Sequence, residues 1–348
     1  MSTIEERIVE EPSELLTHIP QDYTKRLMVF GGRASGELAA KIARYLDVDL
    51  GAVDLRTFAN GEVYCRYEES IRGADVFIVQ STAANEATGM TPNDALMELL
   101  VMIDAAKGAS AHRIIAVMPW YGYSRQDKKS SPREPISARV VAHCLEEIGV
   151  DRVLTMDLHA GQVQGFFTVP VDHMTAMPML TQWFMDQPFD EDIVVVSPDA
   201  GRVKLARNFA RKLGVHWAVL EKERPAQQVA AIGYVVGEVG GKTCVLVDDM
   251  IDTAGTLCAA AATLKDEGAA NVIACATHGV FSGPAYERLP VDGSGIERIV
   301  VTDTLPQRRG APDNITVLST AQTLADSIRR IFTDDSVSEI FAGENQLF

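Results

Sequence analysis

The chain has 348 residues, which favours two domains at the usual size of roughly 100–200 residues each. It is 47% hydrophobic and 23% charged, which is typical of a globular protein with buried cores. Its formal net charge of −16 argues against a general nucleic-acid-binding protein, which usually has a basic face, but is compatible with a local site for a small anion.

No apolar run approaches the roughly 18–20 residues of a membrane span, and the N-terminus lacks a basic segment followed by an apolar one. We therefore expect a cytoplasmic protein without membrane association. The cysteines are scattered and form no C-x-x-C pair, so we expect buried free thiols in a reducing compartment, with neither zinc nor disulfides. They are Cys65, Cys144, Cys244, Cys258 and Cys275.

In chain order, the Glu-rich residues 1–24 come first and are expected to form a mobile acidic tail. Short apolar runs rich in β-branched residues then recur, from Leu27–Phe30 to Ile315–Leu318, and predict buried strands. Helical patterns such as Ser35–Leu46 and Thr256–Glu267 separate many of them. This alternation predicts an α/β fold with mainly parallel sheets.

We expect two successive α/β domains, residues 25–175 and 176–330, followed by a C-terminal segment, residues 331–348, that packs near the N-terminal domain. Ligands of open parallel sheets bind beyond the carboxyl ends of the strands. The residues directly after each apolar run are therefore the candidates for a functional site.

The first candidates lie in the N-terminal half. Phe58, Asn60 and Glu62 belong to a short segment that by itself predicts a β-turn with an exposed aromatic residue. Arg125 and Gln126 follow a predicted strand and several aromatic residues. An arginine beside polar and aromatic groups suits a nucleotide, although a surface turn with aromatic residues packed inward would have the same composition.

Four further candidates follow other predicted strands. His159 and Asp199 could converge on one Mg²⁺ that carries nucleotide phosphates, although a histidine in this position is often structural. Lys222 and Arg224 follow the predicted strand Trp217–Leu220. Cations on a mobile loop can close over developing phosphoryl charge, and the alternative is a solvated charged loop.

The most specific pattern is the segment Val247–Thr256, VDDMIDTAGT. Asp248 and Asp249 end a buried strand, where two carboxylates can accept hydrogen bonds from neighbouring sugar hydroxyls. Small residues then open a helix, whose first backbone N–H groups suit a phosphate. The spacing is not that of a Walker A loop. The remaining loop residues are Asp252, Thr253, Ala254, Gly255 and Thr256.

This loop resembles the ribose-phosphate loop of the type I phosphoribosyltransferase fold. Together with the other motifs it resembles the ribose-phosphate pyrophosphokinase family, in order along residues 25–341. The matching segments are FANGE (58–62), ESIRG (69–73), YGYSRQDKK (121–129), REPISA (133–138), MDLHA (156–160), QGFF (164–167), SPDAG (197–201), EKERP (221–225), VDDMIDTAGT (247–256), ATHGV (276–280) and SVSEIF (336–341).

The resemblance implies two domains of phosphoribosyltransferase type with an active site between them. It implies transfer of the β,γ-diphosphate of ATP to the 1-hydroxyl of ribose 5-phosphate, with release of AMP. In that reading the Val247–Thr256 loop binds ribose 5-phosphate. His159 and Asp199 would bind Mg²⁺–ATP, Arg125 and Gln126 would bind ATP, and Lys222 and Arg224 would neutralise the transition state.

The resemblance also implies assembly and regulation. Phe58, Asn60 and Glu62 would contact the adenosine of ATP in a neighbouring subunit, within a hexamer built from dimers. Inorganic phosphate would activate the enzyme and ADP would inhibit it at a shared site. The matching positions are Ser70, Arg72, Arg133, Ser336, Val337 and Ser338.

The chain departs from the family pattern at several places. An insertion lies around Ala83–Pro92, and Arg202 follows Gly201 where a second glycine is common. Ser130–Pro132 and Glu339 also differ from the usual residues. Two alternatives stay open: a phosphoribosyltransferase that consumes the activated sugar, and a non-catalytic regulatory paralogue of the synthetase.

Overall fold

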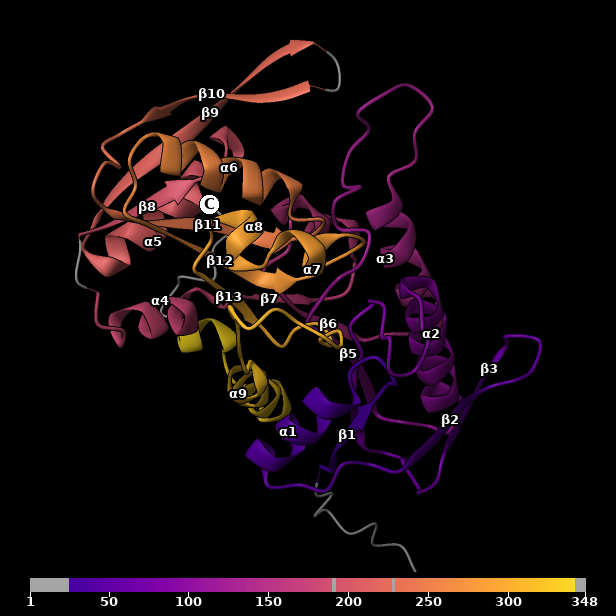
Figure 1. Cartoon of the computed structure of the whole chain (residues 1–348). Coiled ribbons are helices and arrows are strands. Elements are labelled where there is room, and N and C mark those ends of the chain that lie inside the picture. Colours follow the sequence, from indigo (N-terminus) through magenta and orange to yellow (C-terminus); the bar gives the residue numbers. More distant parts are fainter. Residues whose placement is uncertain (1–24, 190–191, 227–228, 342–348) are drawn as a thin grey trace, which may run out of the picture.

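The computed structural model describes residues 25–189, 192–226 and 229–341 (Figure 1). The tail predicted for residues 1–24 and the end of the C-terminal segment lie outside these ranges. The described chain forms two large sheets and one small hairpin sheet, with helices between and around them. This is the α/β architecture that the alternation of apolar runs predicts.

The N-terminal sheet is fully parallel, with strand order β1-β4-β5-β6-β7. Its inner strand β4 has the sequence DVFIV and is buried at every position, because helices cover both faces. The strands are β1 (Leu27–Gly31), β4 (Asp75–Val79), β5 (Arg113–Met118), β6 (Arg152–Met156) and β7 (Val171–Met174). The helices are α1 (Gly36–Leu46), α2 (Pro92–Gly108), α3 (Ser137–Ile148) and the 3-10 helix η1 (Gly161–Phe166).

A separate two-stranded antiparallel sheet consists of β2 (Val53–Thr57) and β3 (Val63–Tyr67). Its hairpin points outward at the edge of the molecule, away from the two large sheets (Figure 1). Helix α2 packs against β3 and holds the base of the hairpin.

The C-terminal sheet has strand order β10-β9-β8-β11-β12-β13-β14, and only β10 is antiparallel to its neighbour. Its strands are β8 (Ile193–Ser197), β9 (His216–Ala226), β10 (Val229–Val236), β11 (Thr243–Ile251), β12 (Asn271–Gly279), β13 (Arg298–Thr302) and β14 (Ile315–Leu318). Its helices are α4 (Met177–Met185), α5 (Val203–Leu213), α6 (Gly255–Asp266), α7 (Ala285–Arg288), α8 (Val291–Ser294) and α9 (Ala321–Phe332), with the 3-10 helices η2 (Ala200–Arg202) and η3 (Val337–Phe341).

One hydrophobic core runs between the two large sheets. It contains inward-facing side chains of both sheets together with buried residues of α1, α4, α5 and α9. The outer face of each sheet has a core of its own. Because side chains of both sheets belong to one hydrophobic core, the domain limits expected from the sequence stay a prediction.

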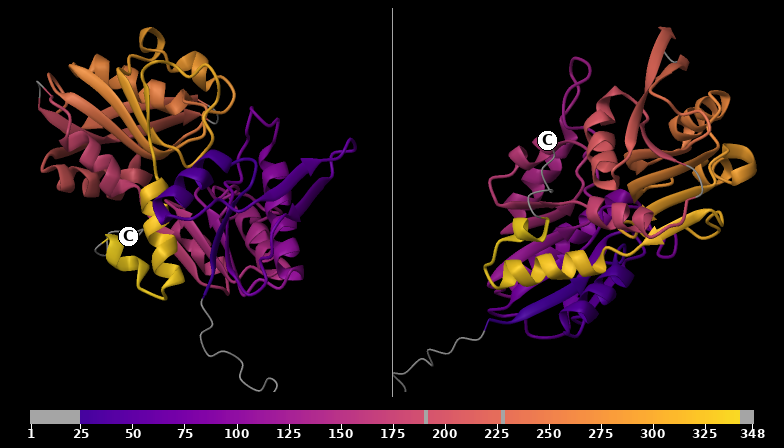
Figure 2. Two further views of the ribbon diagram at one scale, coloured as in Figure 1. Left: turned by 90° about the horizontal axis from the view of Figure 1, so that it is seen from below. Right: turned by 90° about the vertical axis from the view of Figure 1, so that its left-hand side faces the viewer.

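Helix α9 carries the chain from the C-terminal sheet back to the N-terminal one. Its buried residues Leu324, Ile328 and Ile331 belong to the shared core, and the helix packs against α1 (Figure 2). After α9, the buried side chains of Val337 and Phe341 pack into the same core. Apolar contacts therefore fix the described part of the C-terminal segment, up to Phe341, in the shared core.

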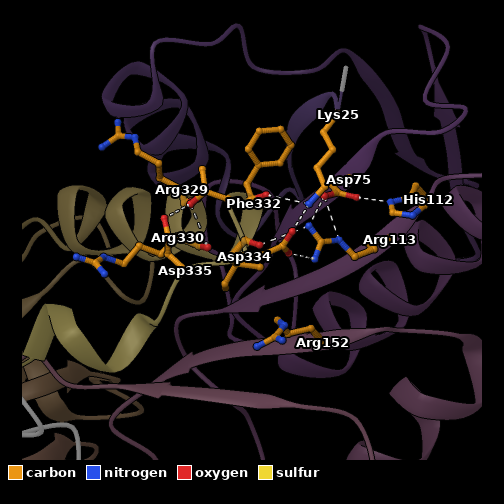
Figure 3. A network of polar contacts seen from close by, with 12 residues as sticks. Lys25, Asp75, His112, Arg113, Arg152, Arg329, Arg330, Phe332, Asp334 and Asp335 are labelled. Carbon is orange, nitrogen blue, oxygen red and sulfur yellow. Dashed lines mark hydrogen bonds and ion pairs between the residues drawn. The ribbon is translucent and has the colours of Figure 1, made fainter. Parts of the chain in front are cut away.

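A polar network fastens the end of α9 to the strands of the N-terminal sheet (Figure 3). Arg113 pairs with Asp75, which is buried at the start of β4, and with Asp334, at 2.9 Å. His112 Nδ1 lies 2.8 Å from Asp75 Oδ1, and Lys25 pairs with Asp334. Burial alone would raise the pKa of Asp75, but hydrogen bonds from Arg113 and His112 outweigh burial and leave that pKa below its usual value.

Candidate active site between the two sheets

The turn after β6 has a backbone conformation that its surroundings hold in place. Asp157 has φ of 37°, a left-handed region that non-glycine residues rarely adopt. Its carboxylate accepts hydrogen bonds from the backbone N–H of Ala176 at 2.8 Å and from the Thr277 hydroxyl at 2.6 Å. The Leu158 N–H donates to His173 Nε2 at 3.0 Å. These bonds offset the backbone strain and fix the direction in which the next residue, His159, points.

The buried side chain of His278 contacts the backbone of the same turn. His278 on β12 lies between the two sheets, with Nε2 at 3.1 Å from the carbonyl oxygens of Met156 and Asp157. Burial lowers the pKa of His278, so the ring is neutral and Nε2–H is the donor to these carbonyls. The Trp120 ring packs edge-on against it, with centroids 4.7 Å apart. The sequence motif ATHGV therefore contributes a structural support for the MDLHA turn.

His159 connects the N-terminal sheet to the central strand of the C-terminal sheet. Its Nδ1 lies 2.7 Å from Oδ2 of Asp249, a side chain with only 8% exposure. An ionised Asp249 can only accept, so Nδ1–H donates to it. This leaves Nε2 as the ring nitrogen that can bind another group, and it orients the ring as carboxylate partners orient metal-binding histidines.

Arg202 lies beside this pair. Its Nε is 3.1 Å from Asp248 Oδ1 and its Nη2 is 2.8 Å from Asp249 Oδ1. Nη2 also lies 2.7 Å from His159 Nδ1. Two N–H donors cannot hydrogen-bond to each other, so Asp249, which both groups contact, brings them together. The sequence marked Arg202 only as a departure from the family pattern and assigned it no role.

The two adjacent aspartates have different environments. Burial raises the pKa of Asp248, and hydrogen bonding and charge repulsion from Asp249 raise it further, to about 8. Burial would also raise the pKa of Asp249, but hydrogen bonding to His159 and the charge of Arg202 outweigh burial and lower it. One of the two carboxyl groups therefore loses its proton at low pH, and the second loses its proton only at a pH near 8.

The rest of the Val247–Thr256 loop follows the centre of the C-terminal sheet. Ala254 has φ of 62° and precedes α6, and its side chain makes no capping hydrogen bond. The first N–H groups of a helix have no partner within the helix, so they can bind an anion here. Thr253 and Thr256 are exposed, and the Thr253 carbonyl accepts a hydrogen bond from Arg288 at 3.0 Å.

Arg125 reaches the same loop from the N-terminal sheet. Its Nη1 forms an ion pair with Oδ2 of Asp252, so a predicted ATP residue and a predicted ribose residue meet directly. Gln126 follows Arg125 and accepts a hydrogen bond from the Ser137 hydroxyl at 2.5 Å. Arg125, Gln126 and Asp252 line a cleft of about 980 Å³. Residues from both sheets form its other walls, among them Trp120, Tyr123, Phe281 and Arg308.

Lys222 and Arg224 lie on a strand, which corrects the loop expected after Leu220. Strand β9 continues to Ala226. Val219 is its last residue paired with β8, and among the described residues the part beyond Val219 pairs only with β10. The two strands form a ribbon that extends past the sheet (Figure 1). Pairing with β10 outweighs the polar, turn-like sequence of this segment. The side chains of residues 222–233 lie outside the described part of the structure.

Asp199 begins the turn between β8 and α5. Its Oδ1 accepts a hydrogen bond from the Gly201 N–H at 2.9 Å and so shapes this turn. The turn ends at Arg202, which contacts His159, so the segment that carries Asp199 reaches the segment that carries His159. Within the described ranges, no group of three or more His, Cys, Asp or Glu side chains could hold a metal ion.

The predicted ATP residues of the β2–β3 hairpin lie away from this cleft. Phe58, Asn60 and Glu62 lie at the exposed tip of the β2–β3 hairpin, where the Phe58 N–H donates to the Glu62 carbonyl at 2.8 Å. Phe58 is 47% exposed. None of the three lines the cleft of their own chain.

The predicted regulatory positions lie in three separate segments. Ser70, Arg72 and Arg133 are exposed, and Arg133 has φ of 73°. Ser336 and Ser338 are also exposed at the C-terminal segment, whereas the side chain of Val337 is buried in the shared core. The Val337 side chain therefore contributes packing, and the exposed positions keep their polar groups at the surface.

In the part of the chain that the structure covers, no helix combines the length and apolar character that crossing a membrane requires.

Comparison with known proteins identifies the family. The model for the N-terminal domain of ribose phosphate pyrophosphokinase matches residues 27–149, and the model for the phosphoribosyl synthetase-associated domain matches residues 220–342. A ribose-phosphate pyrophosphokinase of Clostridium perfringens is 48% identical over 325 residues, covering 92% of this chain and 99% of that protein. One from Corynebacterium efficiens is 50% identical over 324 residues, covering 92% of this chain and 97% of that protein.

A solved structure agrees with these matches. The crystal structure of phosphoribosylpyrophosphate synthetase from Mycobacterium smegmatis superposes with a TM-score of 0.82 at 49% identity, covering 89% of this chain and 100% of that one. Similarity at this level extends over both sheets and both halves of the site. The chain belongs to the ribose-phosphate pyrophosphokinase family.

Proposed function

We propose that the chain transfers the β,γ-diphosphate of ATP to the 1-hydroxyl of ribose 5-phosphate, giving phosphoribosyl pyrophosphate and AMP. The observation that carries the proposal is the meeting of His159 and Arg125, from the N-terminal sheet, with Asp249 and Asp252 of the ribose loop. A reaction between two phosphorylated substrates needs such a convergence, because positioning supplies much of its rate.

The Val247–Thr256 loop would hold the acceptor sugar. The N–H groups at the start of α6 and the hydroxyls of Thr253 and Thr256 would bind the 5-phosphate. The carboxylates at the end of β11 would accept hydrogen bonds from the ring hydroxyls. The position of β11 between β8 and β12 supports this assignment, since a central strand gives the loop a fixed origin.

The donor nucleotide would lie across the cleft. Arg125 and Gln126 would contact ATP, and His159 and Asp199 would hold its Mg²⁺. Asp199 suits this ion, because Mg²⁺ usually binds one or two carboxylates together with substrate phosphates and water, and His159 would add an imidazole nitrogen. When bound, Mg²⁺ supplies charge neutralisation for the transferred group. Asp249 would keep His159 in the orientation that exposes Nε2.

The remaining charge would be neutralised by Lys222 and Arg224 on the β9–β10 ribbon. The transferred diphosphoryl group gains charge on its oxygens in the transition state, so cations that reach it there lower the barrier. Their place on a projecting ribbon would let them approach after both substrates have bound.

Assembly and regulation extend the proposal. The exposed tip of the β2–β3 hairpin would complete the ATP site of a neighbouring subunit, since it lies away from its own cleft. The oligomer would be a hexamer built from dimers. Inorganic phosphate would activate it and ADP would inhibit it at a site with Ser70, Arg72, Arg133, Ser336, Val337 and Ser338.

One assay tests the proposed function. The purified chain is mixed with ATP, Mg²⁺ and ribose 5-phosphate over a range of phosphate concentrations, and AMP release is followed. We expect AMP to form only when ribose 5-phosphate is present. Absence of sugar-dependent AMP at every phosphate concentration would refute the proposal and favour a non-catalytic paralogue. Release of pyrophosphate from added phosphoribosyl pyrophosphate, dependent on a nucleobase, would instead indicate a phosphoribosyltransferase.

A further inference from the structure

The side chain of Arg202 occupies a position that no function assigned so far explains. It starts from the end of η2, next to α5, whose buried residues Ala206, Phe209 and Ala210 anchor that helix in the core. The side chain is 21% exposed and turns toward the end of β11. Its backbone is therefore fixed by packing while its guanidinium lies in the candidate site.

The contacts of Arg202 depend on the shape of its side chain. One edge of the guanidinium, Nε, is 3.1 Å from Asp248, and Nη2 is 2.8 Å from Asp249. A planar guanidinium presents several N–H donors in a fixed fork and can serve two carboxylates at once. A lysine ammonium is a single point charge on a flexible stem and lacks the planar fork that holds two carboxylates in fixed orientations.

The two carboxylates need such a partner. Neighbouring carboxyl groups in a partly buried site repel each other when both are ionised. A cation beside them offsets part of this repulsion, and its N–H donors fix both carboxyl planes. Arg202 also lies 3.4 Å from the His159 carbonyl oxygen through Nη1. The same guanidinium thus touches the ribose loop of the C-terminal sheet and the turn after β6 of the N-terminal sheet.

We propose that Arg202 is a positioning residue for ribose 5-phosphate: it holds Asp248 and Asp249 in the orientation that accepts the sugar hydroxyls before the substrate arrives. Binding energy is then not spent on ordering two repelling carboxylates. The inference rests on the proposed function, because it takes ribose 5-phosphate as the ligand of this loop. Arg202 contacts the loop and need not contact the sugar.

The test measures ribose 5-phosphate affinity directly, by calorimetry without ATP. Arg202→Gln keeps a polar side chain with a planar end group but removes the charge and most of the fork. We expect its dissociation constant for ribose 5-phosphate to rise at least tenfold. The KM for the sugar should rise in parallel, while kcat at saturating sugar stays within about threefold, because positioning of the acceptor loop acts on binding.

Two further variants keep the test decisive. Arg207→Gln removes an exposed arginine from the adjacent helix α5 and should leave the affinity unchanged. Arg202→Lys keeps the charge without the fork, and we expect an affinity between those of the wild type and Arg202→Gln. If Arg202→Gln does not fold, the lysine variant decides, because its affinity must still fall at least threefold.

The outcomes separate the two proposals. Unchanged or tighter ribose 5-phosphate binding by a folded Arg202→Gln, or by Arg202→Lys if the first does not fold, would overturn the positioning role alone. A fall in kcat without a change in sugar affinity would also overturn it. A wild-type chain that binds no ribose 5-phosphate would overturn the proposed function, and this inference with it.

Discussion

The two halves of the proposed reaction site are held by the fold in opposite ways. The ribose loop leaves β11, which is paired on one side with β8 and on the other with β12. The strand residues Thr243–Val247 that lead to it are fully buried. Lys222 and Arg224 lie on β9 beyond its pairing with β8, where, among the described residues, β9 pairs only with β10.

This contrast separates binding from catalysis. A loop that starts from a buried central strand keeps its shape and suits the recognition of a substrate. A two-stranded ribbon outside the sheet has few partners, and such regions have low local stability and can move. We therefore expect changes in the loop to alter affinity and changes in the ribbon to alter turnover.

The largest effect is expected on the ribbon. Lys222→Ala should lower kcat by about 10²–10³-fold, as removal of one donor to a charged transition state does. The dissociation constant for ribose 5-phosphate should stay within about twofold, because the ribose loop is untouched. Steady-state AMP release and calorimetry measure the two quantities. Lys204→Ala, at an exposed lysine of α5, is the control. A loss of turnover below about tenfold, or about 1.4 kcal/mol, would show that Lys222 lacks the assigned role.

The second effect concerns stability at the far end of the N-terminal sheet. Asp75→Asn should lower the free energy of unfolding by about 2–4 kcal/mol at pH 7, because it leaves Arg113 without its buried partner. Urea unfolding measures this loss. Asp326→Asn, in an exposed pair with Arg329, should cost well under about 1 kcal/mol. A loss as small for Asp75→Asn would mean that the network does not hold α9.

The pH dependence of the same variant follows from the direction of the pKa shift. The pKa of Asp75 is lower in the folded chain than in the unfolded chain. Its stabilisation is therefore present above the unfolded value of about 3.9 and is lost as the pH falls toward the folded value. The difference in unfolding free energy between wild type and Asp75→Asn should shrink below pH 4. A difference that stays constant down to pH 3 would contradict the assignment.

The third effect tests the fixed shape of the ribose loop. Ala254→Val places a β-branched residue at a φ of 62°, which costs about 1–3 kcal/mol. We expect the dissociation constant for ribose 5-phosphate to rise about tenfold, since that corresponds to about 1.4 kcal/mol. Ala259→Val, at an exposed position of the same helix α6, should change it less than twofold. Equal affinities of the two variants would mean that the loop adapts freely.

The smallest effect is expected at the insertion around Ala83–Pro92. Glu86 pairs with Arg308 at 2.6 Å, from the other side of the cleft, but both side chains are more than a third exposed. Glu86→Ala should lower the free energy of unfolding by no more than about 1 kcal/mol, and the loss should vanish at high salt. A larger loss would mean that this pair, and not the shared core alone, sets the arrangement of the two sheets.

The sequence predicts the fold well where the signal is local. Runs such as Asp75–Val79 are apolar at almost every position, and only strands buried on both faces account for that pattern. The extension of β9 is not predictable from the sequence, because it comes from pairing with β10 and its own residues favour a turn. The contact of α9 with α1 is not predictable either, since the sequence of an amphipathic helix does not identify the element against which it packs.

The candidate site is also predictable from the sequence only where the signal is local. Strand ends identified His159 and the ribose loop, and the structure joins them through Asp249. The contacts of Arg202 with Asp248 and His159 join three distant parts of the chain, so the sequence alone could mark Arg202 only as unusual. The support that His278 gives to the turn after β6 is likewise a contact between two strands of different sheets.

The most direct test of the separation between binding and turnover uses two variants side by side. Ribose 5-phosphate affinity and kcat are measured for Lys222→Ala and Arg202→Gln in the same buffer, with wild type as the reference. We predict that Lys222→Ala loses turnover and keeps sugar affinity, whereas Arg202→Gln loses sugar affinity and keeps turnover at saturating sugar. If both variants lose sugar affinity, or both lose turnover, the loop and the ribbon do not have the separate roles in binding and catalysis that the fold indicates.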